Sequence, residues 1–323
     1  MNLTKFLIKR IGISVITIFV ITTITFFLMY CLPGKPFLGD RPLPPEVLMH
    51  VNAKYGLDKP VFQRYLIYIT NVLKGDFGTS IVYTNRDVTS IIQDSFPVSA
   101  DLGMRALLFG CTGGILLGIL AALNHNKAWD RASTMIAIIG VSVPSFILGT
   151  MLQYVLGVQV STLFKTLFHT GYQLFPLSRW ESFRYTIIPA FVLGLGALAS
   201  VTRMMRTSML DVINQDYIKT AKAKGISKQA IIWKHMVRNA VMPVFTVVGQ
   251  MIGMVLTGSF VIENIFSIPG LGKYFVTSVT SSDYPMTMGL TLFYAIFIVL
   301  INMLVDIGYG IIDPRVRIVK GRV

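Results

Sequence analysis

The fold follows from the stretch DYIKTAKAKGISKQAIIWKHMVRNAVMP, which occupies residues 216–243. This stretch is polar and basic, and it lies between two strongly apolar runs. Its pattern predicts a helix, a turn and a second helix. Ile213, Tyr217 and Ala221 recur at four-residue steps, which would place them on one face of the first helix.

Two residues mark the predicted turn between these helices. Gly225 is the expected C-cap of the first helix, because glycine adopts the left-handed conformation without a steric penalty. Ser227 is the expected N-cap of the second helix. That second helix is predicted to have two stripes. The apolar stripe consists of Trp233, Met236, Val237, Ala240 and Val241, and the polar stripe of Lys234, His235, Arg238 and Asn239.

Two interpretations of this segment remain open on pattern alone. Small residues and a glycine at a helix end let another surface approach the backbone closely, which suits a docking element. The same composition is also typical of a basic helix lying on a membrane surface.

Composition places the rest of the chain in a membrane. The protein has 323 residues, is 53% hydrophobic and has a mean hydropathy of +0.65, which indicates an all-α integral membrane protein. A span needs about 20 apolar residues. Six runs qualify, and we expect transmembrane helices at residues 11–32, 98–123, 132–158, 185–201, 243–262 and 286–311. They would form a single membrane domain over residues 1–323.

Charge placement predicts the orientation of the spans. With the N-terminus inside, 17 of the 29 lysines and arginines fall in inner segments and 11 in outer segments, and nine acidic residues fall outside against four inside. An excess of Lys and Arg on the cytoplasmic side sets the orientation of most membrane proteins. We therefore expect both termini and residues 203–242 in the cytoplasm and residues 33–97 outside. The net charge of +14 also favours contact with anionic membrane lipid.

Several other functions are disfavoured by what the sequence lacks. The basic residues are divided among loops, so no nucleic-acid partner is expected. Cys31 and Cys111 lie in apolar runs, and the four histidines are scattered without metal-ligand spacing. No Gly-x-Ser-x-Gly motif occurs, and residues 270–274 are an incomplete phosphate loop. We therefore assign no catalytic, cofactor-binding or metal-binding residues, and we do not expect an enzyme.

Three residues within or near the spans are candidates for a translocation path. Asp101 and Arg105 are four residues apart, so they can pair on one helix face. Charges in spans usually face protein or water, but these lie near a span end and could simply reach the interface. Pro144 lies inside the third predicted span, where it would kink the helix. That kink either lines the path or serves only packing.

The segment 216–243 resembles the EAA loop of ABC importer permeases. The variant in peptide and nickel permeases runs Asp-Tyr-hydrophobic-x-Thr-Ala-x-x-x-Gly and then His-x-x-x-Asn-x-x-x-Pro. The matching residues are Asp216, Tyr217, Thr220, Ala221, Gly225, His235, Asn239 and Pro243. The segment departs from the general EAA form in two ways: Lys219 stands where glutamate is usual, and the spacing from Gly225 to Pro243 is longer than in that form. Both departures are typical of the peptide branch. Residues 55–60, 75–80 and 263–272 also resemble stretches of that family.

This resemblance implies a fold and an assembly. The fold is the type I ABC importer permease fold (MetI-like), with both termini cytoplasmic. The chain would be the first (B-type) permease component of an oligopeptide or dipeptide importer in the bacterial cytoplasmic membrane. Its implied partners are a second permease subunit, two ATPase subunits, an extracellular substrate-binding protein and the peptide substrate. ATP hydrolysis would take place on the partners.

The resemblance also implies a role for the matching residues. The eight residues would couple the permease to its ATPases, with Ala221 and Gly225 against the ATPase surface. Import of nickel or a metal chelate is the alternative substrate. An ion-coupled secondary carrier is a further alternative, although such carriers usually place ionisable groups deep in their spans.

The predicted topology can be tested by cysteine labelling. In a variant without Cys31 and Cys111, single cysteines at Lys74 and Lys228 should react with an impermeant thiol reagent from opposite faces of the membrane, because one lies in residues 33–97 and the other in residues 203–242. Reaction of both from the same face would contradict the six-span orientation.

Overall fold

The structure is a computed structural model that describes residues 3–31, 49, 56, 58–83, 86–169, 175–176 and 180–312. The start of the expected outer segment, residues 33–48, and the residues from 313 onward lie outside the described residues. Within the described part every element is a helix, apart from one isolated antiparallel bridge between Thr79 and Asp87. The expectation of an all-α protein is confirmed.

Six helices in the described part are long and apolar enough to cross a membrane, as expected. They are Ile8–Cys31, Val88–Leu123, Ser145–Phe168, Phe183–Ile213, Lys228–Leu256 and Tyr284–Gly308. Large apolar side chains such as Ile16, Phe19 and Leu28 are exposed along the first of them. A helix that exposes such side chains requires lipid or another protein around it.

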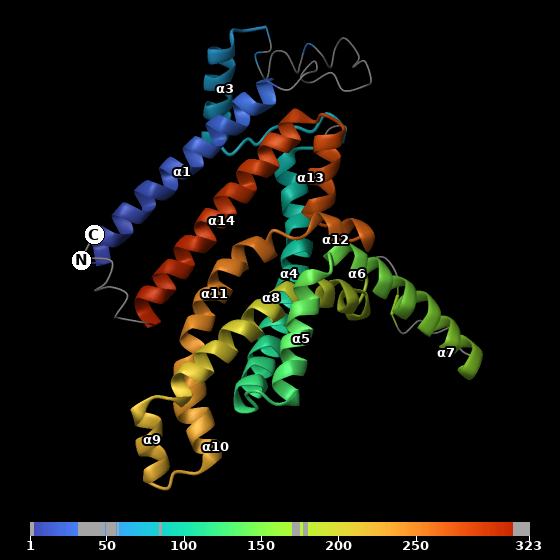
Figure 1. Ribbon diagram of the computed structural model, residues 1–323. Helices are drawn as coiled ribbons and strands as arrows, with labels where there is room; N and C mark the ends of the chain where they lie inside the picture. The colour runs from blue at the N-terminus through green and yellow to red at the C-terminus, as the bar shows by residue number, and fades with distance from the viewer. Residues whose placement is uncertain are drawn as a thin grey trace. The chain divides into compact units, whose positions relative to one another are not determined.

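The chain divides into two compact units (Figure 1). Unit 1 contains Met1–Val98 and Gly270–Val323, and unit 2 contains Ser99–Pro269. Helix α4 (Val88–Leu123) contributes its first turns to unit 1 and the rest to unit 2. The hydropathy pattern of the sequence predicts one membrane domain and does not indicate this division.

Unit 1 consists of the chain's two ends. Its helices are α1 (Leu3–Cys31), α3 (Val61–Leu73), the start of α4, α13 (Leu271–Thr280) and α14 (Tyr284–Ile312). α1 packs along α14, and an ion pair between Arg10 and Asp306 joins them. The buried core of the unit consists of Val88, Ile91, Ile92, Leu271, Met286 and Leu290.

A buried carboxylate fixes the loop of unit 1 before α4. Asp283 is fully buried and accepts hydrogen bonds from the Ser80 hydroxyl at 2.5 Å and from the backbone N–H groups of Ile81 and Val82 at 3.1 and 3.2 Å. It also accepts from the N–H of Met286 at the start of α14, at 3.2 Å. Because a buried charge is tolerated only when it is well bonded, Asp283 holds this loop against the α13–α14 turn.

Unit 2 is organised around α8 (Phe183–Ile213). Helices α5 (Ala128–Ser142), α6 (Ser145–Leu152) and α11 (Arg238–Leu256) all pack against α8. The π-helical segment η1 (Gln153–Val160) and α7 (Ser161–Phe168) continue α6, and α12 (Phe260–Ile265) packs on α6 and α8. Between α8 and α11 lie α9 (Asp216–Ala223), α10 (Lys228–Ala230) and the π-helical η2 (Ile231–Val237).

Glycines allow α4 and α8 to pack closely. A Cβ at Gly110 would lie 2.5 Å from the carbonyl oxygen of Gly194, and a Cβ at Gly194 would lie 2.5 Å from the carbonyl oxygen of Ala106. Gly114 and Gly118 face Val201 and Met205 of α8 at similarly short distances. Small residues four apart on one helix are the usual basis of such packing in membranes.

The third predicted span differs from the structure. α5 ends at Ser142, Val143 is extended with ψ of 122°, and Pro144 is the N-cap of α6. The residue before a proline disfavours the helical conformation, and here that preference breaks the helix completely. The expected single helix over residues 132–158 with a kink at Pro144 is therefore replaced by two helices, the second of which continues through residue 168.

The second and fourth helices are longer than predicted. α4 begins at Val88 instead of residue 98 and includes Pro97, and α8 continues to Ile213 instead of residue 201. At 1.5 Å per residue, α4 is about 50 Å long, which exceeds the roughly 30 Å hydrocarbon core of a bilayer. Hydropathy marks only the part of such a helix that is apolar.

The close packing of α4 and α8 yields a prediction with a matched control. Gly194→Ala should destabilise the protein by about 1–3 kcal/mol, since the new methyl group overlaps the α4 backbone. Gly196→Ala, two residues away with nothing within 4 Å of its Cβ position, should be neutral or stabilising by up to about 1 kcal/mol. Thermal unfolding in detergent measures both variants, and equal effects would contradict the packing.

Candidate functional site

The first helix of the segment 216–243 begins later than its pattern predicts. Ile213 is the last residue of α8, and α9 starts at Asp216 after a turn. Ile218 and Ala221 are buried, whereas Tyr217 is 43% exposed. The predicted face of Ile213, Tyr217 and Ala221 is therefore wrong, because the chain turns between the first and second of these residues.

The turn after α9 is the one that the sequence predicts. Gly225 has a φ of 73°, in the left-handed region. Its N–H donates to the carbonyl oxygen of Lys222 at 3.0 Å, and the N–H of Ile226 donates to that of Ala221 at 3.3 Å. These two bonds form a Schellman motif, which satisfies the last carbonyls of a helix. Ser227 then accepts a hydrogen bond from the N–H of Ala230 at 3.4 Å. Both predicted caps are confirmed.

The second helix of the segment is partly π-helical, which changes its buried stripe. Ile231 and Met236 are both buried although they are five residues apart, and Ala240 and Val244 continue the stripe. Trp233 is 57% exposed, so its predicted place in the apolar stripe is wrong. A π-helix bonds each residue to the fifth one along, so a 3.6-residue pattern does not locate this stripe.

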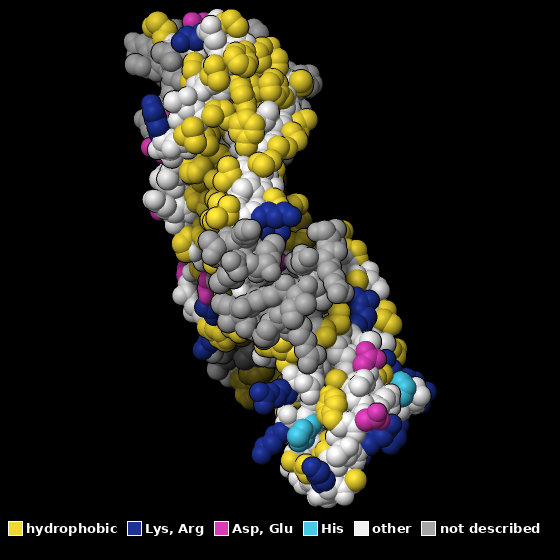
Figure 2. Space-filling view, turned by 90° about the vertical axis from the view of Figure 1, so that its left-hand side faces the viewer, with side chains coloured by type: hydrophobic (Ala, Val, Ile, Leu, Met, Phe, Trp, Pro, Cys, Tyr) yellow, Lys and Arg dark blue, Asp and Glu magenta, His cyan; other side chains and the backbone are white. Residues whose placement is uncertain are grey.

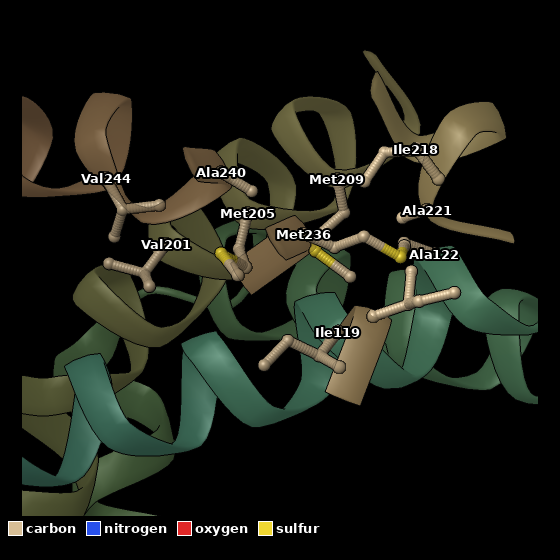
Figure 3. Close-up of a cluster of buried hydrophobic side chains, with 11 residues drawn as sticks. Ile119, Ala122, Val201, Met205, Met209, Ile218, Ala221, Met236, Ala240 and Val244 are labelled. Carbon is tan, nitrogen blue, oxygen red and sulfur yellow. The ribbon is translucent and has the colours of Figure 1, made fainter. Parts of the chain in front are cut away.

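The buried faces of α9 and η2 meet α4, α8 and α11 in one hydrophobic cluster, shown in Figure 3. Ile218 is fully buried there, in the same cluster as Met205 and Met209 of α8. Ala221 is 5% exposed and belongs to the same cluster as Ala122 of α4. The small side chain of Ala221 therefore packs within this chain, and the contact of this residue with a partner stays a prediction.

The opposite face of α9 is exposed and polar. It presents Tyr217, Lys219 and Thr220, and Lys219 pairs with Asp216 at 2.9 Å. Such an exposed pair contributes little to stability. Figure 2 shows Lys and Arg side chains gathered at the lower end of the view, the end where Figure 1 places α9 and α10. This face is available to a partner.

The other predicted residues of the segment lie on the helix that leads back to the core. The Asn239 side chain donates to the carbonyl oxygen of His235 at 2.7 Å, a bond within the helix. Pro243 lies inside α11. The eight residues are thus not gathered at one point. Asp216, Tyr217 and Thr220 are exposed on α9, Ala221 is buried on the same helix, and Gly225 forms the turn. The other three, His235, Asn239 and Pro243, lie on the second helix.

The structure also contains a buried ion pair near this segment, and neither of its residues is among the predicted site residues. Asp130 of α5 is 4% exposed and pairs with Arg206 of α8 through two hydrogen bonds of 2.6 and 2.8 Å. The Asn126 N–H also donates to it at 2.9 Å, and His125 Nδ1 lies 3.4 Å away. The hydrogen bond from Arg206 holds the pKa of Asp130 well below its usual range. The partners are 76 residues apart in sequence, so no local pattern reveals them.

The charged candidates for a translocation path form the predicted pair. Arg105 Nε donates to both carboxylate oxygens of Asp101 at 2.9 Å. Its Nη1 donates to the Thr186 hydroxyl at 3.4 Å, and its guanidinium lies 5.2 Å from the ring centroid of Phe183. The pair therefore also fastens α4 to the first turn of α8. Among the described residues, no group of three or more His, Cys, Asp or Glu is placed to hold a metal ion.

The sequence matches a known family over most of its length. Residues 114–318 match the family described as binding-protein-dependent transport system inner membrane component. Residues 3–103 match the N-terminal part that accompanies it. The chain belongs to this family. It is a multi-pass membrane permease, as its six apolar helices indicate.

Curated relatives match this permease over nearly their full length. It is 42% identical to the dipeptide transport system permease protein DppB of Bacillus subtilis (strain 168), covering 98% of this chain and 99% of that protein. It is 40% identical to DppB of Lactococcus lactis subsp. cremoris (strain MG1363), covering 98% of this chain and 100% of that protein. Identity to the oligopeptide transport system permease protein OppB of Haemophilus influenzae is 38%, covering 97% and 99%.

One solved structure shows the fold independently of sequence. The crystal structure of an amino acid ABC transporter with histidines matches the permease with a TM-score of 0.50, over 68% of this chain and 92% of that chain. The identity is only 11%, so this likeness concerns the fold alone. The expected ABC importer permease fold is confirmed.

The burial of Ala221 predicts the effect of enlarging it. Ala221→Trp should lower the thermal stability of the isolated permease, since the indole has no room in the cluster beneath α9 and overpacking costs about 1–3 kcal/mol. Thr220→Trp, one residue earlier and exposed, should leave stability unchanged. Scanning fluorimetry of the permease without any partner checks both, and an unaffected Ala221→Trp variant would contradict the packing.

Proposed function

We propose that this permease is the first membrane subunit of an ABC importer for dipeptides or oligopeptides. The relatives that match it over nearly their whole length carry dipeptide and oligopeptide transport in their names. The segment 216–243 is proposed to connect the permease with separate ATPase subunits, where ATP hydrolysis takes place.

The proposed coupling role is supported mainly by the two different faces of α9. Its outer face is exposed and polar, whereas Ile218 and Ala221 on its inner face are buried against α4, α8 and α11. A helix fixed in this way cannot shift without moving the spanning helices beneath it, because close-packed cores transmit displacement. A push on the outer face therefore becomes a rigid-body movement in unit 2.

The proposed assembly follows from the division of labour in a binding-protein-dependent system. A second, related permease completes the path, two ATPases contact the cytoplasmic segments, and a substrate-binding protein delivers the peptide from outside. The proposal has both termini and α9 in the cytoplasm, which the excess of Lys and Arg in those segments supports. Asp101, Arg105 and Pro144 remain candidates for the path, and the first two also hold α4 against α8.

The outer face of α9 is tested by adding bulk where it does not disturb the core. Thr220→Trp in the assembled transporter should abolish substrate-stimulated ATP hydrolysis and weaken co-purification of the ATPases, since Thr220 is exposed on α9. Lys127→Trp, exposed in the turn between α4 and α5, serves as the surface control. Normal transport by the Thr220 variant would mean that α9 is not the coupling element.

The substrate class is tested by uptake in proteoliposomes that contain the complete assembly. Dipeptides, tripeptides and longer peptides should be taken up with ATP, and nickel, free or chelated, should not be. ATP-dependent accumulation of nickel without peptide uptake would contradict the proposed substrate and favour the metal importer.

A further inference from the structure

A groove opens beside the coupling helix at the end of unit 2. Its volume is about 680 Å³, which lies within the range of about 300–1,000 Å³ typical of ligand pockets. One wall is the end of α4 and the following turn, including Leu123 and His125. The other wall is formed by the α9–α10 turn and η2, where the half-buried Ile226 and Ile232 line it.

The groove combines apolar walls with a basic rim. Its polar rim residues are Asn214, Lys222, Lys228 and His125, and all four are exposed. No acidic side chain is among the residues that line it, all of which belong to the described part of the chain. Leu123 is 38% exposed, so part of the apolar wall is uncovered in the isolated chain.

The position of the groove along α8 favours a protein occupant over a lipid. Residues 203–242 are expected in the cytoplasm, so Arg203 and Arg206 would lie at the inner interface of the membrane. Leu210 and Asn214 of the groove follow Arg206 by four and eight residues on α8 or at its C-cap, which is about 6–12 Å further along the helix axis. An apolar wall at that level lies beyond the hydrocarbon core.

We propose that this groove receives an apolar side chain from an acidic segment of the ATPase subunit. The apolar walls would cover the side chain, and the two lysines would face carboxylates beside it. This inference rests on the proposed coupling function and adds a second contact to it. The ATPase contacts the outer face of α9, and one of its side chains also inserts between α9 and the α4–α5 turn.

The Asp130–Arg206 pair fixes the position of the α4–α5 turn, which forms one wall of the groove. Asp130 binds the Asn126 backbone of the turn and Arg206 of α8 at the same time, and Arg206 Nη2 lies 3.2 Å from His125 Nδ1. The turn is therefore fastened to α8, one of the helices that carry the groove. A preformed groove loses less conformational freedom when its partner binds.

Thiol protection tests the occupant directly. In a variant with Cys31→Ser and Cys111→Ala, single cysteines replace Leu123 in the groove, Lys127 outside it and Thr220 on the outer face of α9. A charged maleimide is applied to the permease assembly in nanodiscs, with and without its ATPases. ATPase binding should slow the reaction at least tenfold at Leu123→Cys and Thr220→Cys, and less than twofold at Lys127→Cys.

The outcomes of this experiment distinguish failure of the groove proposal from failure of the proposed coupling function. Protection at Thr220→Cys but not at Leu123→Cys overturns the groove while the coupling function stands, and no protection at either position refutes both. Equal protection at Lys127→Cys would mean general coverage of the turn and would overturn insertion. Protection of Leu123→Cys without ATPases, in nanodiscs containing phosphatidylglycerol but not in phosphatidylcholine alone, would assign the groove to an anionic lipid.

A charge-reversal pair tests the rim with matched controls. Lys222→Glu with Lys228→Glu changes the rim, and Lys224→Glu with Lys234→Glu makes the same charge change at exposed positions outside the groove. The rim variant should bind the ATPases at least tenfold more weakly than the control, with a smaller salt dependence, because complementary charges steer and hold a partner. Equal losses in the two variants would overturn the proposed acidic partner at this rim.

Discussion

The packing of Ile218 and Ala221 against the cluster beneath α9 is the interaction on which the proposed mechanism depends. Both side chains are buried among residues of α4, α8 and α11. Without that contact α9 would be a polar helix of eight residues, and isolated helices of that length are marginal in water. The contact makes the helix part of unit 2, so that a force on its outer face reaches the helices that span the membrane.

The helices beneath α9 are held together by two different means. Along the apolar part of α4 and α8, glycines bring the backbones close, as at Gly110 and Gly194. In lipid there is little hydrophobic driving force between helices, so close packing must supply the attraction. At the end next to α9, the ion pair between the buried Asp130 of α5 and Arg206 of α8 joins these two helices. Removing one partner of such a pair would leave a buried charge without compensation.

Ala221 shows that one residue pattern can fit two different kinds of contact. Its small size fits a surface that a partner approaches, and it fits equally well a helix that packs closely on its own chain. Sequence alone cannot separate these cases, because both select for a small side chain. The structure separates them by burial: Ala221 is 5% exposed, whereas its neighbour Thr220 is exposed. In our proposal the partner therefore contacts the outer face of α9 and the adjacent groove.

The sequence by itself determined the six apolar helices, the helical hairpin of residues 216–243 and the caps at Gly225 and Ser227, because hydropathy, chain length and left-handed backbone preference are local properties. Only the tertiary structure decided that Trp233 is exposed while Ile231 and Met236 are buried, that Pro144 separates two helices, and that Asp130 meets Arg206. These features depend on backbone hydrogen bonding and on contacts between residues far apart in the chain, and neither leaves a periodic signal in the sequence.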